Sequence, residues 1–386
     1  MRRLALIALA ATIAGAPTAA KAQDTFKIGL NVERSGNAAS YGGHVIIATQ
    51  IAVDEINRAG GIDGAKLELV IEDNRTSPEQ AVVAVRNLDR AGVVAVVGPI
   101  QTSQARTAFP ATNRAALVSV SPGSGAPGLS AQNRPWTFRN AAIDQTIFGD
   151  VVKSFRERYP AVKTFALTVD PKDAYQTNLM TKVAPPALEA NGFMLVNRDS
   201  PMEIPVDATD YSVFVTKLRG MNVDAAVVGL VIEQGKTFLR ELNRQQVKLP
   251  LIGGLGFVTD SIAQVAGGLD FYSGQPFDPG SSDPSVVAFV KEFKERSEKE
   301  LPGQYTTPLY IEAGAYESVK IIADALKAAK LKPGGDPKAA REAVRAYFAG
   351  LKDYQGLGNT ITINADGDAV KPTLVFHTKD GRWERL

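Results

Sequence analysis

The sequence contains no cysteine and only two histidines among its 386 residues. The absence of cysteine excludes disulfides, thiolate nucleophiles, cysteine-based zinc sites and iron–sulfur clusters. His44 and His377 lie far apart in the sequence, and neither has a cluster of carboxylates nearby, so we expect no metal site. These absences remove much of the catalytic chemistry that a chain of this length can carry.

Net charge and long apolar runs are also scarce. The 43 basic and 41 acidic residues leave a net charge of +2, which gives no basic surplus for a nucleic-acid backbone. Arg2 and Arg3, an apolar run at 4–13 and the sequence Ala20-Lys21-Ala22 are typical of a secretory signal peptide, cleaved after Ala22. The alternative, a membrane anchor, needs roughly 20 apolar residues. We therefore expect an exported, soluble, nearly neutral protein in the periplasm.

Short apolar runs alternate with amphipathic stretches along most of the chain. The run 93–97 is continuously apolar, as in a strand that is buried on both faces of a parallel sheet. Ser77-Pro78-Glu79-Gln80 has the N-cap, first-turn proline and capping-box pattern of a helix start. The predicted strands are 26–30, 67–71, 93–97, 116–120, 164–169, 193–197, 225–229, 251–253, 360–363 and 373–377. This alternation predicts an α/β fold with two doubly wound parallel sheets.

Two loops follow neighbouring predicted strands and contain residues suited to an anion. The segment 123–128 matches the pattern G-x-G-x-x-G, but the polar residues 129–135 after it are not helical, which disfavours a dinucleotide site. A plain turn, or a loop whose backbone N–H groups bind an anion, fits better. The segment 98–103 is the same kind of candidate anion site one strand earlier, and Thr102 or Ser103 would cap the helix that follows it. The alternative for that loop is a cap without a ligand.

The sequence gives little support for an enzyme. A serine hydrolase that used His377 would need a G-x-S-x-G elbow, and none is present. We expect Asp170, Asp173 and Glu233 to be solvated loop residues rather than an acid/base pair. Three tyrosines, each in a loop or at a helix start, could together line an apolar pocket that admits water: Tyr41, Tyr175 and Tyr310. We expect no cofactor.

A series of short motifs, spread in order over nearly the whole mature chain, resembles the leucine/isoleucine/valine-type solute-binding proteins of ABC importers. Each motif is weak alone, but the ordered set is specific. The N-terminal motifs are Thr25-Phe26-Lys27-Ile28-Gly29-Leu30, Ser35-Gly36, Tyr41-Gly42, Asp54-Glu55-Ile56-Asn57 and Gly60-Gly61-Ile62. The later ones are Glu72-Asp73, Ser77-Pro78, Val97-Gly98-Pro99, Val120-Ser121-Pro122, Tyr175, Asp210-Tyr211-Ser212 and Val223-Asp224.

This resemblance implies a type I periplasmic binding protein, in which two α/β lobes joined by a three-segment hinge close on a ligand like a Venus flytrap. It places lobe one at 24–143 plus 274–356, and lobe two at 144–273 plus 357–386. It also implies that the ligand carboxylate is held by Thr102 and by groups of the loop after Ser121. The ligand-binding residues it implies are Tyr41, Gln101, Thr102, Ser121, Gly123, Ser124, Gly125, Tyr175, Val231, Leu255, Phe257 and Tyr310.

Two of these positions depart from the pattern of amino-acid-binding relatives. Such relatives have a glutamate that pairs with the ligand ammonium where this sequence has Leu255, and an aromatic residue where it has Val231. A buried ammonium without an acceptor costs several kcal/mol. We therefore expect a small carboxylate with an apolar or aromatic body, such as an aromatic acid or a keto acid. Glu233 is a possible substitute acid, which leaves a branched-chain amino acid as the alternative.

The expected partners are this small carboxylate and an inner-membrane ABC permease, with no nucleic acid. We expect the protein to be a monomer. A ligand sensor of the same fold, which presents its closed form to a signalling receptor, is the alternative role. Neighbouring genes for two permeases and two ATPases would favour transport.

Overall fold

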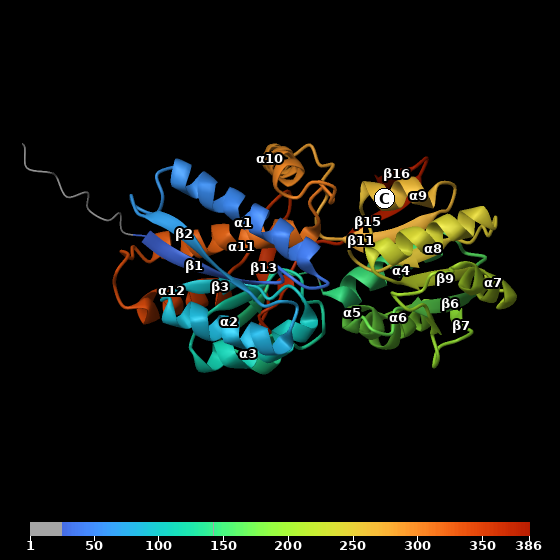
Figure 1. Cartoon of the computed structure of the whole chain (residues 1–386), viewed down its shortest axis with the longest axis horizontal. Helices are drawn as coiled ribbons and strands as arrows, with labels where there is room; N and C mark the ends of the chain where they lie inside the picture. The colour runs from blue at the N-terminus through green and yellow to red at the C-terminus, as the bar shows by residue number, and fades with distance from the viewer. Residues whose placement is uncertain (1–24, 142) are drawn as a thin grey trace, which may run out of the picture.

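The computed structural model describes residues 25–141 and 143–386, which form two α/β lobes arranged end to end (Figure 1). The predicted signal peptide lies outside the described residues. Within the described part of the chain, no helix combines the length and apolar character needed to cross a membrane.

Lobe one is built on a five-stranded parallel sheet with the strand order β2-β1-β3-β4-β5. Helices α1 and α11 pack together on one side of it, and α2 and α3 on the other (Figure 1). The central strands are therefore covered on both faces, which explains the continuous apolar run at β3. The strands are β1 (Thr25–Val32), β2 (Lys66–Asp73), β3 (Ala95–Val97), β4 (Ser119–Ser121) and β5 (Thr137–Arg139). The helices are α1 (Ala39–Arg58), α2 (Pro78–Arg90), α3 (Thr102–Arg114), α10 (Pro284–Glu300), α11 (Tyr310–Ala328) and α12 (Pro337–Ala349).

Lobe two contains an eight-stranded sheet with the order β16-β15-β11-β10-β9-β6-β7, in which β8 also pairs with β6. The segment from β6 to β11 is parallel, and β15 and β16 add an antiparallel edge. The strands are β6 (Thr164–Val169), β7 (Met194–Leu195), β8 (Met202–Glu203), β9 (Ala225–Gly229), β10 (Leu251–Gly253), β11 (Phe271–Gln275), β15 (Leu374–Lys379) and β16 (Arg382–Arg385). The helices are α4 (Asp144–Arg158), α5 (Ala174–Asn178), α6 (Ala184–Ala190), α7 (Ser212–Gly220), α8 (Ile232–Arg244) and α9 (Asp260–Ala266).

The chain crosses between the lobes three times, after β5, after β11 and before β15. A small antiparallel sheet formed by β12 (Tyr354–Gln355), β13 (Thr360–Ile363) and β14 (Ala369–Val370) precedes the third crossing. This sheet belongs to lobe one, because Arg139 of β5 bridges to Asp368. The predicted boundary at 356/357 is therefore wrong, and residues 357–370 lie with lobe one. Their strands are too short and too polar to show which lobe they join.

The predicted alternation of strands and helices is confirmed, and so is the cap at Ser77, whose Oγ accepts a hydrogen bond of 3.3 Å from Gln80 N. Two strands next to the crossings were not predicted. β5 has only three residues, and β11 has the sequence Phe-Tyr-Ser-Gly-Gln, which lacks an apolar run. Both are held by neighbouring strands rather than by their own sequence pattern.

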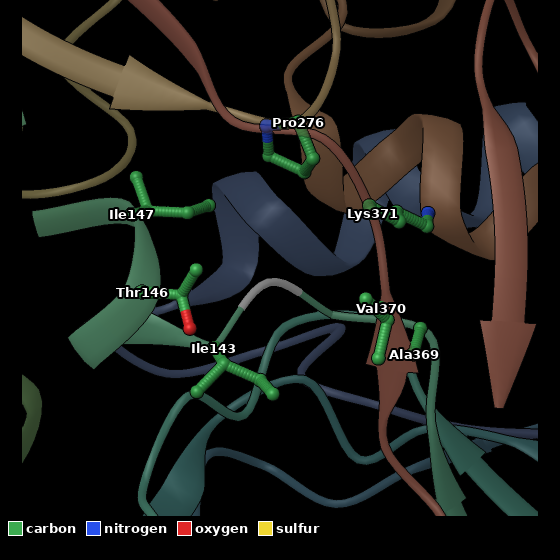
Figure 2. Close-up of a pocket in the computed structure, with 7 residues that line it drawn as sticks. All are labelled: Ile143, Thr146, Ile147, Pro276, Ala369, Val370 and Lys371. Atoms are coloured by element: carbon green, nitrogen blue, oxygen red, sulfur yellow. The ribbon is translucent and has the colours of Figure 1, made fainter. Parts of the chain in front are cut away.

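The three crossings meet around a cavity of about 30 Å³ (Figure 2). Its lining combines Ile143 from the first crossing, Pro276 from the second and Lys371 from the third, together with Thr146, Ile147, Ala369 and Val370. A space of this size holds about one water molecule. The three crossing segments are therefore packed closely against each other.

A buried ion pair fixes two of the crossings to lobe one. Lys371 Nζ lies 2.6 Å from Glu317 Oε2 on α11, and both side chains are almost fully buried. The same carboxylate accepts hydrogen bonds from Asn140 Nδ2 at 3.1 Å and from Leu357 N at 2.9 Å. The first and third crossings therefore share one buried negative charge.

We expect Lys371→Met to destabilise the protein by about 3–5 kcal/mol, because it leaves the Glu317 charge buried without its partner. Urea denaturation of the two proteins measures the difference. The control is Lys153→Met, which breaks the exposed pair with Asp150 and should cost less than about 1 kcal/mol. Equal losses in the two variants would contradict this role of the buried pair.

Candidate functional site at the junction of the lobes

The amino end of α3 is exposed to the junction without a side-chain cap. Gln101 occupies the N-cap position but its side chain makes no capping hydrogen bond, so neither of the predicted caps, Thr102 or Ser103, is used. Ser103 Oγ donates instead to Gln104 Oε1. The first N–H groups of a helix have no intrahelical acceptor, and together with the helix dipole they favour an anion. The predicted anion-binding character of this loop therefore has a structural basis.

The loop after β4 is tied to the loop before α3 by a single hydroxyl. Ser121 Oγ donates to Pro99 O at 2.6 Å, and it accepts hydrogen bonds from Ser124 N at 3.0 Å and from Ser124 Oγ at 2.7 Å. The two hydroxyls therefore serve the loops themselves. Among the described residues, the N–H of Gly125 has no hydrogen-bond acceptor, so this part of the loop offers a backbone donor.

Arg139 supports the same loop from behind. Its guanidinium binds both oxygens of Asp368 at 2.6 Å and donates through Nη1 to the carbonyls of Ser124 and Ala126. The side chain is only 2% exposed. With its donors occupied in this way, Arg139 holds the loop in position and leaves the binding of an anion to the main chain.

Asp144, the first residue of α4, lies against this loop and was not predicted. Its side chain is 1% exposed, and neither carboxyl oxygen has a hydrogen-bond partner in the described structure. A Cβ atom at Gly125 would collide with both oxygens, so the absence of a side chain at Gly125 admits the carboxyl. Burial raises the pKa of Asp144 to about 7, although the nearby Arg139 charge lowers it in part. An acid directly after the predicted crossing at 143/144 was the signal that could have identified it.

The three predicted tyrosines come from three elements and approach the same place. Burial raises the pKa of each hydroxyl, and carboxyls raise it further: Glu312, Asp173 and Glu233 act on Tyr41, and Asp144 acts on both Tyr175 and Tyr310. The prediction that Tyr41, Tyr175 and Tyr310 gather around one site therefore agrees with their surroundings. Asp170 and Asp173 are not solvated as expected: Asp170 is only 2% exposed, and burial raises the pKa of Asp173.

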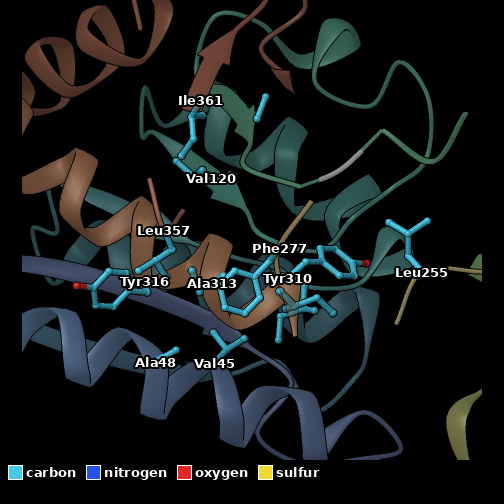
Figure 3. Packing of buried hydrophobic residues seen from close by; sticks show 14 of the residues in the cluster. Val45, Ala48, Val120, Leu255, Phe277, Tyr310, Ala313, Tyr316, Leu357 and Ile361 are labelled. Atoms are coloured by element: carbon cyan, nitrogen blue, oxygen red, sulfur yellow. The ribbon is translucent and has the colours of Figure 1, made fainter. Parts of the chain in front are cut away.

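Leu255 places an apolar side chain on the lobe-two side of the junction. Leu255 is 7% exposed, donates its N–H to Tyr175 Oη at 3.3 Å, and lies beyond the hydroxyl end of Tyr310 (Figure 3). Phe257 does not share this position. It packs edge-on against Phe271 and touches Gly235, within the core of lobe two. The expectation that Phe257 lies beside the ligand is wrong, because the chain turns this side chain into the lobe-two core.

Val231 and Glu233 lie at the start of α8. Val231 is half-buried, and its N–H donates to Gln234 Oε1 at 3.2 Å. The Glu233 side chain is 78% exposed, and both of its oxygens lie 3.0 Å from Lys236 Nζ. As a substitute for the missing acid, Glu233 would have to leave this ion pair. Across the junction, Thr307 Oγ1 donates to Asp260 Oδ2 at 3.4 Å, so the two lobes are in contact.

The geometry agrees with a known family. A family model described as periplasmic binding protein matches residues 25–382. The chain belongs to this family. Its curated relatives include the leucine-, isoleucine-, valine-, threonine- and alanine-binding protein of Pseudomonas aeruginosa, 27% identical over 350 residues that cover 89% of this chain and 88% of the relative.

Solved structures match this periplasmic binding protein along almost its whole length. The branched-chain amino acid substrate-binding protein LivJ of Streptococcus pneumoniae, solved with isoleucine, has a TM-score of 0.77 at 25% identity and covers 94% of this chain and 99% of its own. A solute-binding protein of R. palustris, solved with benzoate, shares the fold with a TM-score of 0.77 at 17% identity, covering 94% and 95%. The predicted type I fold and the resemblance to Leu/Ile/Val-type proteins of ABC transporters are confirmed. These relatives are binding proteins, not enzymes.

The raised pKa of Asp144 predicts that this periplasmic binding protein loses stability as the pH rises. A carboxyl with a higher pKa in the folded than in the unfolded state binds more protons when folded, so unfolding becomes easier between about pH 4 and pH 7. In the ligand-free, refolded protein, Asp144→Asn should therefore add about 1–3 kcal/mol at pH 8 and little at pH 4. Urea denaturation at both pH values, with the exposed Glu157→Gln as control, measures this. An equal effect at both pH values would contradict it.

Proposed function

We propose that this ABC-type periplasmic solute-binding protein captures a small carboxylate with an apolar or aromatic body, and delivers it to an inner-membrane permease. The observation that carries the proposal is the pair of loops at 98–102 and 121–125, fixed to each other by Ser121. Each leaves one backbone N–H without an acceptor among the described residues, at Thr102 and at Gly125, at the carboxyl ends of adjacent strands, where open α/β sheets bind ligands. Thr102 and Gly125 would hold the carboxylate, and Gly123 and Ser124 would join them only by giving up their hydrogen bonds to Ser121 Oγ.

The body of the ligand would lie between the lobes. Leu255 and Tyr175 from lobe two and Tyr41 and Tyr310 from lobe one supply apolar surface there, and the tyrosine hydroxyls supply a few polar contacts. Leu255 stands where amino-acid-binding relatives have an acid, so this wall offers no counter-charge for an ammonium. The first candidate is therefore an aromatic acid or a keto acid. A protonated Asp144 could donate its O–H to such a ligand.

The second candidate is a branched-chain amino acid, and Asp144 is the observation that favours it. An ionised carboxyl that is buried without a partner is costly, and a ligand ammonium beside Gly125 would supply the missing partner. The curated relative in Pseudomonas aeruginosa is named as a binder of leucine, isoleucine, valine, threonine and alanine. In this case Asp144 would replace the glutamate that is absent at Leu255.

We expect a matched panel of ligands to separate the two candidates in a thermal-shift assay on refolded protein. The panel holds leucine, 4-methyl-2-oxopentanoate, phenylalanine, phenylpyruvate, phenylacetate and benzoate. A ligand at 100 times its Kd should raise the Tm by about 3–6 °C. Shifts only with acids that lack an amine support the first candidate, and shifts only with amino acids support the second. If no carboxylate in the panel raises the Tm, the proposed function is wrong.

Two substitutions give the same distinction from the protein side. Under the first candidate, Leu255→Glu should raise the Kd of the best-binding acid by about 30-fold or more, because a carboxylate replaces apolar surface beside an anion. Leu255→Gln, of the same size but neutral, is its control. Under the second candidate, Asp144→Asn should weaken the binding of leucine by about 30-fold or more, because a buried charge pair is lost. Calorimetric Kd values decide, and Glu157→Gln should change neither.

The location and the assembly are part of the proposal. The relatives are periplasmic binding proteins, and cleavage after Ala22 would release this chain into the same compartment as a monomer. Mass spectrometry of the mature N-terminus tests the cleavage site. A transport role, rather than sensing, would be supported by neighbouring permease and ATPase genes.

A further inference from the structure

A second buried carboxyl lies behind the amino end of α3. Glu33 directly follows β1 and its side chain is fully buried. Its Oε1 accepts a hydrogen bond from Gln101 N at 3.2 Å, and its Oε2 accepts one from Ile100 N at 3.4 Å. These are the last two amides before Thr102. The amino end of α3 therefore already holds one carboxyl that belongs to the protein.

The elements packed around Glu33 bring no cation to it. On the α1 side, the backbone of Glu33 lies so close to Gly42 that a Cβ there would collide with it. The segment after β2 contributes Asn74, a neutral hydrogen-bond partner. The charged and titratable groups within two residues of these contacts are Arg34, Tyr41, His44, Glu72, Asp73 and Arg75. In the described part of the chain, no Lys or Arg makes an ion pair with Glu33.

A ligand carboxylate at Thr102 would therefore share one helix end with Glu33. Two carboxyls that are close together and shielded from water do not both stay ionised, and the pKa of one of them rises strongly. The ligand carboxylate is a strong acid by comparison with Glu33, because burial already raises the pKa of Glu33 to about 7, despite the hydrogen bonds from Ile100, Gln101 and Asn74. The proton therefore goes to Glu33.

We propose that Glu33 couples ligand capture to proton uptake: its carboxylate gains one proton from the solvent when a ligand carboxylate binds at the amino end of α3. This inference rests on the proposed function, since it needs an anion at that place. The balance is simple. The ionised protein, a proton and the anion combine into a complex in which Glu33 is a neutral acid and the ligand remains a carboxylate.

The sign of the pH effect follows from this balance. At a pH well below the pKa of free Glu33, the group is already protonated and affinity does not depend on its charge. As the pH rises above 7, Glu33 must take up a proton from the solvent before the ligand can bind. The affinity therefore falls until the pH exceeds the pKa of Glu33 in the complex. A periplasmic binding protein of this kind would capture its ligand best in a mildly acidic medium and release it more easily as the pH rises.

Isothermal titration calorimetry with phenylacetate and with leucine, one probe for each candidate ligand, tests the proposal. Titrations at pH 7.5 in phosphate and in Tris, whose ionisation enthalpies differ, give the number of protons taken up. We expect Glu33→Gln to lower this number by roughly half a proton relative to the wild type, and to flatten a roughly tenfold rise of Kd between pH 6 and pH 8.5. The exposed Glu157→Gln should behave as the wild type. Asp144 contributes equally to both proteins, so the difference reports on Glu33.

The outcomes are distinguishable. If a probe binds and Glu33→Gln takes up as many protons as the wild type, the coupling is overturned while the proposed function stands. If Glu33→Gln fails to fold, the wild-type protein alone decides. Binding of a probe with no proton uptake and no change of Kd with pH then overturns the coupling. If neither probe binds, the proposed function fails and the coupling fails with it.

Discussion

The candidate site depends on one hydroxyl group, that of Ser121, which keeps two loops in register. A hydroxyl has a single proton, and here it points to Pro99 O, so both lone pairs face the residues after β4. The backbone donors of that loop are thereby held beside the amino end of α3. Because the strands that carry the two loops are neighbours in a parallel sheet, the loops emerge on the same edge. Local hydrogen bonding and sheet topology together create the concentration of main-chain donors.

The charges around these donors are unusual for an anion site. The carboxyls of Asp144 and Glu33 are buried near the two loops, and Glu312 is buried beside Tyr305. Burial raises the pKa of each of these three acids to about 7. The basic side chain near Asp144, Arg139, is bound to Asp368 and to loop carbonyls. Protonation of buried acids, rather than pairing with lysine or arginine, is therefore how this junction can limit its negative charge near neutral pH.

The sequence was sufficient for the fold class, the family and the two loops, because these depend on apolar periodicity and on glycine, proline and hydroxyl residues that recur in order. It was insufficient where the tertiary structure decides. β5 and β11 have no apolar run, and residues 357–370 join lobe one through the contact of Asp368 with Arg139, two residues far apart in the chain. Phe257 and Leu255 look equivalent in sequence, yet one packs into the lobe-two core and the other faces Tyr310. Asp144 carries no motif, and its importance comes from being buried without a partner.

The path of the chain has a consequence for how the protein is made. The Arg139–Asp368 bridge of lobe one spans 229 positions, and the sheet of lobe two gains β15 and β16 only from the last residues. Both lobes thus contain contacts between distant parts of the chain, which slow folding, and the lobe-two sheet must wait for strands near the C-terminus. A ribosome-bound nascent chain has all five strands of the lobe-one sheet once residue 139 has emerged, but it cannot complete the lobe-two sheet or the Arg139–Asp368 bridge. Lobe two would therefore stay incomplete until synthesis ends, and an incompletely folded polypeptide can be threaded through a narrow membrane channel.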